Sequence, residues 1–207
     1  MSMSVNEVNK LKYAPSVQGV LPPFLERWSP RAFAERAVSR ADLRRVFEAA
    51  RWAPSSGNAQ PWRFIVGIKG SETHRKIAAT LAGYNKEWAP KAPVLILGTT
   101  AALNSRGAAN GYALYDLGAA AVSITLEAAA LGLVTHQMGG YDQEAIRMEL
   151  GIPESYALGS VMALGYQDEP AALGEEELIK REIAPRQRKP LSEVVFTAWD
   201  EPAVLDE

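Results

Sequence analysis

Apolar residues recur with helical spacing in the segment that follows Ser39. They stand at i, i+3, i+4 and i+7, which places them on one face of a helix. These residues are Leu43, Val46, Phe47 and Ala50. Ser39 has the side chain of a helix N-cap, and Asp42 follows three residues later as in a capping box. The pattern therefore predicts a helix that starts after Ser39 and ends before the loop at Pro54.

The rest of the chain alternates predicted strands with predicted helices. Short apolar runs predict strands at residues 63–68, 94–100 and 160–166. Helices are predicted at residues 72–82, 111–131 and 142–150. Gly151 and Pro153 end the last of these helices. A chain of 207 residues is long enough for a single domain with a large core. We place that domain at residues 21–207, after an N-terminal arm at residues 1–20.

Two apolar segments need a surface against which to pack. The helix at 111–131 is rich in alanine and glycine, and it carries Ser123, Thr125 and Glu127. A membrane span needs about 20 residues of greater bulk, so we expect a buried helix packed on several sides, with room for a partner subunit. The tail from about residue 190 is also apolar. Its large apolar residues are Leu191, Val194, Val195, Phe196 and Trp199.

Composition and charge exclude several classes of protein. Lys and Arg total 22 and Asp and Glu total 24, so the net charge is −2, which argues against a nucleic-acid partner. Because there is no cysteine, disulfides, thiolate nucleophiles and iron–sulfur clusters are excluded. His74 and His136 are far apart in sequence, and no metal site is expected. No secretory signal is recognised at the N-terminus, so we expect a cytoplasmic protein without a membrane partner.

Two arginine-containing segments supply candidate ligands for an anion. Arg27 and Arg31 flank Ser29, while Arg186 and Arg188 follow in the charged C-terminal region. A guanidinium group presents planar, permanently charged donors that suit a phosphate, and a serine hydroxyl adds a further donor. Taken alone, each segment is more typical of a solvated charged turn.

Two loops supply candidate contacts to a planar ligand. Residues 53–62, Ala-Pro-Ser-Ser-Gly-Asn-Ala-Gln-Pro-Trp, concentrate amides and hydroxyls that can match the edge of a heteroaromatic ring. Gly139 and Gly140 precede the helix at Asp142, and without a Cβ their backbone N–H groups can approach a flat ligand closely. A polar connecting loop and a simple turn also explain these two patterns when each is taken alone.

In this order along the chain, the segments resemble the nitroreductase family of FMN-dependent NAD(P)H oxidoreductases. The resemblance runs from about Arg27 to Val195, and Pro-Ser-Ser-Gly-Asn-Ala-Gln-Pro-Trp at 54–62 is its most specific part. Asp116 and Gly118 at the Ala-rich helix also fit. The resemblance implies an α+β fold of three layers, α-β-α, with a mixed or antiparallel sheet flanked by helices. It also implies a homodimer whose C-terminal extension, from about residue 190, embraces the partner.

The resemblance implies a phosphate-binding role for the arginine segments. Arg27, Ser29 and Arg31 would hold the FMN phosphate and the pyrimidine side of the ring. Trp28 would contribute mainly through its backbone. The two C-terminal cations that would complete the phosphate site are Arg186 and Arg188.

The same resemblance assigns flavin contacts to the loops. The residues that would reach the flavin of the other subunit are Pro54, Ser55, Ser56 and Asn58. Gly139 and Gly140 would place a backbone N–H near flavin N5, and Asn85 is a further flavin contact. The acceptor pocket is expected within residues 84–112, including Trp88.

The activity that the resemblance implies is electron transfer from NADH or NADPH, through FMN, to a small electron-poor acceptor such as a nitroaromatic or a quinone. A ping-pong cycle with no catalytic side chain is expected, because FMN itself brings the redox centre to a chain without cysteine or metal cluster. Other hypotheses remain open. They are a specialised flavin enzyme (a dehydrogenase, a dehalogenase or a flavin-modifying enzyme), a flavin-storage or flavin-sensing protein without turnover, and a phosphate-binding module without flavin.

Overall fold

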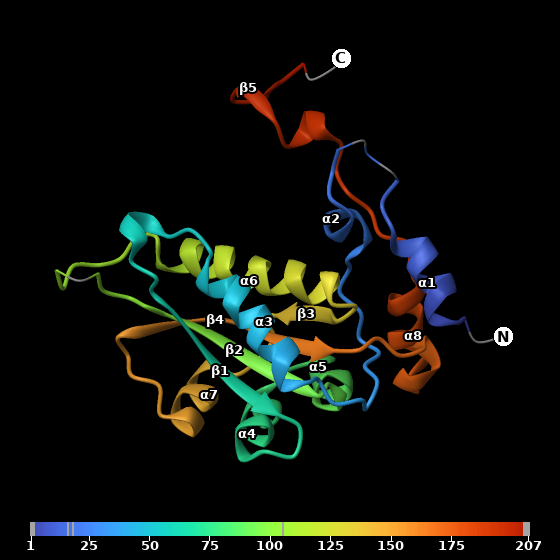
Figure 1. Ribbon diagram of the computed structural model, residues 1–207, viewed down its shortest axis with the longest axis horizontal. Coiled ribbons are helices and arrows are strands. Elements are labelled where there is room, and N and C mark those ends of the chain that lie inside the picture. The colour runs from blue at the N-terminus through green and yellow to red at the C-terminus, as the bar shows by residue number, and fades with distance from the viewer. Residues whose placement is uncertain (1–2, 16, 18, 105, 205–207) are drawn as a thin grey trace.

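The centre of the computed structural model, which describes residues 3–15, 17, 19–104 and 106–204, is a four-stranded antiparallel sheet (Figure 1). The strands are β1 (Trp62–Ile68), β2 (Val94–Ala101), β3 (Val134–Met138) and β4 (Tyr156–Gly165). Their order in the sheet is β1-β2-β4-β3. Ile65 lies opposite Leu97, and Met162 lies between Ile96 and Gln137. The resemblance implied a mixed or an antiparallel sheet, and the sheet is antiparallel.

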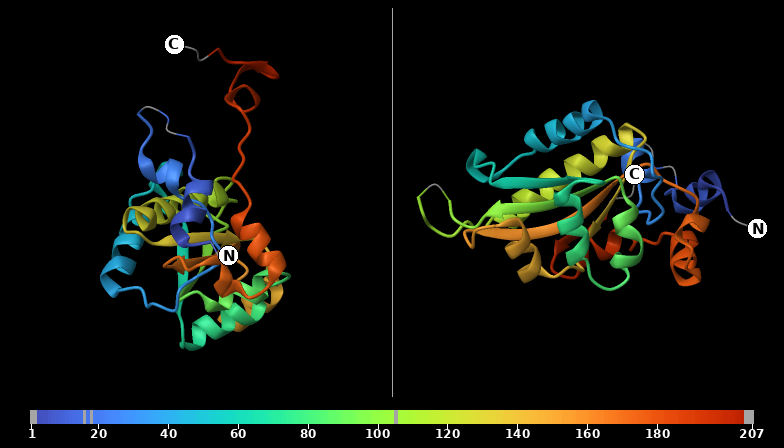
Figure 2. Two further views of the ribbon diagram at one scale, coloured as in Figure 1. Left: turned by 90° about the vertical axis from the view of Figure 1, so that its right-hand side faces the viewer. Right: turned by 90° about the horizontal axis from the view of Figure 1, so that it is seen from below.

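Helices cover both faces of this sheet, as Figure 2 shows in its right-hand view. One face carries α3 (Arg40–Arg51) and α6 (Ala113–Ala130). The other carries α4 (Glu72–Thr80), α5 (Asn85–Trp88) and α7 (Gln143–Leu150). Because side chains alternate along a strand, Val94 and Ile96 of β2 enter the core under α6, while Leu95 and Leu97 enter the opposite core. The predicted three-layer α+β architecture is confirmed.

Helix ends follow the local sequence. Ser39 caps α3 by accepting a hydrogen bond from the Asp42 N–H at 3.0 Å, and Asp142 caps α7 in the same way. Gly151 ends α7 with a φ of 62°, a left-handed conformation that glycine adopts readily. These predicted helix ends are confirmed.

The strand predictions are less accurate. The strand predicted at 160–166 begins earlier, at Tyr156, and β3 was not predicted at all. Strand β3 lies at the edge of the sheet and carries Thr135, His136 and Gln137 in its middle. Such a short polar sequence lacks the apolar run by which a strand is recognised.

Helix α6 has the length and mean hydropathy of a membrane span. In the structure it packs between α3 and the sheet, and Ala120, Ile124 and Ala128 are buried there. The small side chains permit this close approach, and the predicted core helix is confirmed. Its outer face is apolar but open, since Tyr115 is 77% exposed and Val122 is 46% exposed.

Helices α1 (Val5–Lys12), α2 (Pro22–Glu26) and α8 (Glu176–Ile183) gather at one end of the molecule (Figure 1). From this end the tail extends away from the body, as Figures 1 and 2 show. The tail contains η4 (Leu191–Glu193), β5 (Phe196–Ala198) and β6 (Glu201–Pro202). Trp199 is 91% exposed. The remaining short helices are η1 (Ser56–Asn58), η2 (Ala89–Lys91) and η3 (Pro170–Leu173).

Candidate functional site

Three arginines from two distant segments of the sequence lie together, and one of them contacts Ser29. Arg27 Nη2 donates a hydrogen bond to Ser29 Oγ at 3.1 Å. The Arg186 guanidinium donates to the backbone carbonyls of Arg27 and Leu25. Burial lowers the pKa of Arg27, and the nearby charges of Arg186 and Arg188 lower it further. The structure thus brings the two predicted cationic segments into one cluster, which we call the arginine cluster (Arg27, Arg186 and Arg188).

Nothing in the described part of the chain neutralises this cluster. Within the described residues, no carboxylate lies within 4 Å of its guanidinium groups, and the buried Arg27 Nε has no hydrogen-bond partner. Arg27 lines an open cavity of about 670 Å³ together with Trp28, Gly132 and Gln167. The Gln167 Nε2 is likewise buried and unpaired. Because unpaired buried donors and charges are costly, this end of the cavity suits an anionic ligand rich in acceptor oxygens.

Trp28 anchors the N-terminal helix to this segment. Its Nε1–H donates to Asn9 Oδ1 at 2.8 Å, and the Lys12 ammonium lies 4.6 Å from the centre of its ring. The side chain is buried. The polar atom of the indole is therefore engaged within the chain, which leaves the backbone of Trp28 for contact with a ligand.

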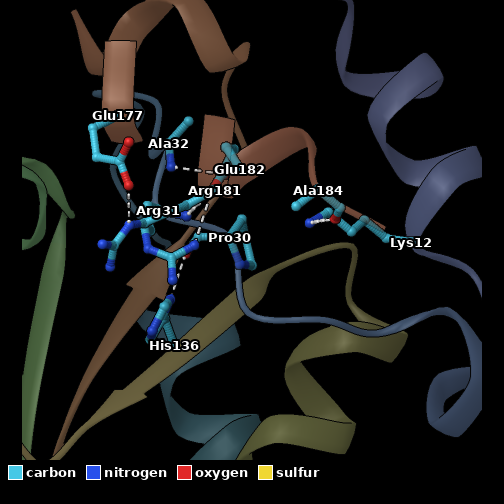
Figure 3. Close-up of polar contacts among 9 residues, drawn as sticks. All are labelled: Lys12, Pro30, Arg31, Ala32, His136, Glu177, Arg181, Glu182 and Ala184. Atoms are coloured by element: carbon cyan, nitrogen blue, oxygen red, sulfur yellow. Dashed lines mark hydrogen bonds and ion pairs between the residues drawn. The ribbon is translucent and has the colours of Figure 1, made fainter. Parts of the chain in front are cut away.

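Arg31 lies next to the arginine cluster but is paired with Glu182 of α8 (Figure 3). Its Nη1 lies 3.5 Å from Glu182 Oε2. The N–H groups of Arg31 and Ala32 also donate to this carboxylate, at 2.8 and 3.1 Å. The sequence analysis did not identify Glu182 as a site residue, because it lies in a charged stretch of the chain. The spacing could have indicated its burial, since Glu182 follows the buried Leu178 by four residues and so lies on the same face of α8.

His136 of β3 lies beneath the same segment, and its Nδ1 is 3.0 Å from the carbonyl oxygen of Pro30 (Figure 3). Burial lowers the pKa of His136 to about 4, and the charge of Arg31 adds to this effect. At neutral pH the ring is uncharged, so its Nδ1–H donates to Pro30. The sequence gave no sign of this role, because β3 itself was not predicted.

The loop between α3 and β1 is held in a strained form. Its residues with positive φ are Gly57, Asn58 and Gln60, at 56°, 54° and 46°. Such angles are unusual for residues other than glycine and are typical of functional loops. The Ser56 N–H donates to both carboxylate oxygens of the buried Asp116 at 3.2 Å, and Ser55 Oγ accepts from the Gln60 N–H at 3.0 Å. Pro54 and Asn58 are exposed.

Asn85 and the glycine pair, predicted separately as flavin contacts, lie side by side. Asn85 Nδ2 donates to the carbonyl of Gly140 at 3.0 Å, and both Gly139 and Gly140 are exposed. The expectation that Trp88 lines an acceptor pocket is wrong. Trp88 is 1% exposed, because its ring packs against His136 with the ring centres 4.5 Å apart.

Within one chain Arg27 of the arginine cluster, directly after α2, and the α3–β1 loop lie at opposite ends of α6, as the places of α2 and of this loop in Figure 1 show. Ser56 contacts Asp116 in the first turn of α6, whereas Arg27 shares its cavity with Ala129 near the last turn. At 1.5 Å per residue, these two positions on α6 are roughly 20 Å apart. The two sets of predicted site residues therefore do not form one site within a single chain.

Comparison with known proteins identifies the family. The model of the nitroreductase family matches residues 25–99 and 70–166. A protein of Archaeoglobus fulgidus, provisionally named NADH dehydrogenase/NAD(P)H nitroreductase, is 33% identical over 144 residues, 68% of this chain and 80% of the relative. The chain belongs to the nitroreductase family.

Two further relatives match over most of their length. The NADH dehydrogenase of Thermus thermophilus is 29% identical over 206 residues, which cover 83% of this chain and 92% of the relative. A crystal structure described as an oxidoreductase containing FMN is similar with a TM-score of 0.83 and 34% identity. It covers 89% of this chain and 94% of that one. The match in structure includes most of the fold described above.

Proposed function

We propose that this chain is an FMN-dependent oxidoreductase that takes electrons from NADH or NADPH and passes them to a small electron-poor acceptor, such as a nitroaromatic or a quinone, in a ping-pong cycle. The observation that carries the proposal is the arginine cluster, with its buried and unpaired Arg27 Nε. Family membership supports it, as do the printed names of the relatives, which include an NAD(P)H nitroreductase and an oxidoreductase containing FMN.

The residues present fit a flavin mononucleotide. Its phosphate is a dianion with acceptor oxygens, and the arginine cluster offers three guanidinium groups without a carboxylate among the described residues to compete for them. Ser29 adds a hydroxyl beside Arg27. When bound, FMN supplies an N5 atom that accepts hydride from a nicotinamide and gives up electrons to an acceptor.

The protein has two tasks in such a reaction. The arginine cluster neutralises and positions the phosphate, as fixed cations do for phosphoryl groups elsewhere. The exposed Gly139–Gly140 backbone, held by Asn85, offers peptide groups without a Cβ to the ring. With FMN bound, the N–H groups of Gly139 and Gly140 would be the peptide donors placed to stabilise negative charge on the ring.

We further propose that the enzyme is a homodimer in which each flavin contacts both chains. In support, the α3–β1 loop and the arginine cluster lie at opposite ends of α6, so a second copy is needed to bring a loop to each cluster. The open face of α6 and the protruding tail supply apolar surface for such an interface. We propose a cytoplasmic location, where the NAD(P)H pool is available.

Flavin content tests this proposal and its alternatives. The protein should purify yellow, or take up added FMN, at about one FMN per subunit. If the protein is colourless and binds no FMN, the only one of these hypotheses that remains is a phosphate-binding module without flavin. A yellow protein whose flavin is not bleached by NADH or NADPH without oxygen would be a storage or sensing protein.

A further inference from the structure

The segment 27–32, which we call the cofactor loop, is held largely by side chains from other elements. Arg186 donates to the carbonyl of Arg27, and His136 donates to the carbonyl of Pro30. Glu182 accepts from the N–H groups of Arg31 and Ala32. These three side chains come from the segment between α8 and the tail, from β3 and from α8 respectively. Since buried backbone groups need partners, the path of the loop depends on all three.

Glu182 makes the largest set of these contacts (Figure 3). Its Oε1 accepts from the Arg31 N–H at 2.8 Å and from the Ala32 N–H at 3.1 Å. Its Oε2 lies 3.0 Å from the Arg31 backbone nitrogen and 3.5 Å from Arg31 Nη1. The side chain is 1% exposed. One carboxylate thus binds both the backbone and the side chain of Arg31.

Two positive charges beside the cofactor loop act on Glu182. Arg31 and Lys12 face Glu182, and they favour its charged form against the effect of burial, which raises its pKa. Lys12 also donates to the carbonyl of Ala184, the residue directly after the end of α8 (Figure 3). Arg27, by contrast, is influenced by Arg186 and Arg188 and has no carboxylate neighbour among the described residues. Glu182 therefore pairs with Arg31, whereas the neighbouring arginine cluster has no carboxylate partner among the described residues.

We propose that Glu182 is a positioning residue for the flavin phosphate. By holding Arg31 and the N–H groups of the cofactor loop, it fixes the place of Arg27 and Ser29, and so it sets how strongly the protein distinguishes FMN from riboflavin. The proposal rests on the proposed function. A buried carboxylate costs free energy unless it is paired, and among the described residues the hydrogen bonds and the ion pair of Glu182 are all made with the cofactor loop.

The test is the ratio of the dissociation constants of riboflavin and FMN. Glu182→Gln keeps the size of the side chain and one acceptor oxygen, but it loses the charge that pairs with Arg31. Glu182→Asp keeps the charge and shortens the reach. Glu177→Gln is the matched control, because Glu177 lies on the same helix and pairs with Arg181 on the exposed surface at 3.0 Å (Figure 3).

We expect Glu182→Gln to weaken FMN binding about tenfold while riboflavin binding changes by no more than about twofold. The ratio should fall by an intermediate amount in Glu182→Asp and stay unchanged in Glu177→Gln. A merely structural role would weaken both flavins equally and leave the ratio unchanged, so that result overturns the proposal. If Glu182→Gln does not fold, the ratio for Glu182→Asp decides, and an unchanged value there also overturns it. A wild-type protein that binds neither flavin would contradict the proposed function itself.

Discussion

Asn85 Nδ2 donates a hydrogen bond to the carbonyl oxygen of Gly140 at 3.0 Å, across 55 residues of sequence. The N–H of Ala82 donates to the same oxygen at 2.9 Å. These two bonds tie the start of α5 to the turn that follows β3. The peptide group between Gly140 and Tyr141 is therefore oriented by a segment on another element, directly after the Gly139–Gly140 backbone that we propose faces the flavin.

Gly140→Ala should disturb this arrangement, whereas Gly139→Ala should not. A Cβ on Gly140 would come within 2.8 Å of Asn85 Nδ2, but a Cβ on Gly139 meets nothing within 4 Å. Loss of the hydrogen bond should cost about 1 kcal/mol, which corresponds to a melting temperature about 2–4 °C lower. Thermal melts of both variants measure this. Equal melting temperatures would show that Asn85 can move away at no cost.

Arg27→Ala should weaken binding of FMN about ten- to a hundredfold more than binding of riboflavin, because it removes a charged donor to the phosphate. Arg188→Ala should act in the same direction. Arg75→Ala is the control, since Arg75 is exposed on α4. Fluorescence titration with the two flavins gives the dissociation constants. Equal losses for both flavins would mean that these arginines do not contact the phosphate.

Removal of the tail after Pro190 should yield an aggregated or flavin-free protein. The truncation deletes Leu191, Phe196 and Trp199, which one chain leaves exposed and which we propose pack on the partner. Light scattering, together with the ratio of flavin to protein absorbance, measures both outcomes. A chain that ends at residue 204 serves as the control. A monodisperse monomer with one FMN per chain would contradict the shared site.

Stability should decrease as the pH falls from about 6.5 towards 4, partly because of His136. The folded pKa is lowered to about 4, so over this range the unfolded chain binds a proton that the folded chain does not. Stability must then decrease with falling pH, by at most about 3 kcal/mol for this residue. Urea unfolding at several pH values measures the slope. His136→Asn, which keeps His74 unchanged, should have a shallower slope, and an equal slope would show that His136 titrates normally.

Much of the fold could be predicted from local patterns. The cap at Ser39, the apolar face of α3 and the stop at Gly151 each depend on neighbouring residues, and each is confirmed. Strand β3 could not be predicted, because it lies at the sheet edge and Gln137 there binds Ser160 rather than entering a core. A strand that is stabilised mainly by pairing with an adjacent strand has only a weak pattern in its own sequence.

In the candidate site, too, features that depend on neighbouring residues could be predicted, and features that depend on distant contacts could not. The arginine motifs were visible as residue types, and the structure brings Arg27 and Arg186 together. The roles of Glu182, His136 and Asp116 depend on contacts between segments 60 or more residues apart, so spacing alone could not indicate them. The prediction that Trp88 lines the acceptor pocket was wrong for a related reason. An aromatic residue near a loop or a helix end can line a pocket or enter the core, and its packing against residues distant in the sequence determines which of the two it does.

The most direct test of the proposed function is anaerobic stopped-flow absorbance of the FMN-loaded protein. We predict that NADH or NADPH alone bleaches the flavin near 450 nm, and that a quinone or nitroaromatic added afterwards, with no nicotinamide left, restores the colour. These two separate half-reactions define a ping-pong cycle. A flavin that stays oxidised with both nicotinamides, or that is bleached and not reoxidised by any acceptor of these classes, would contradict the account.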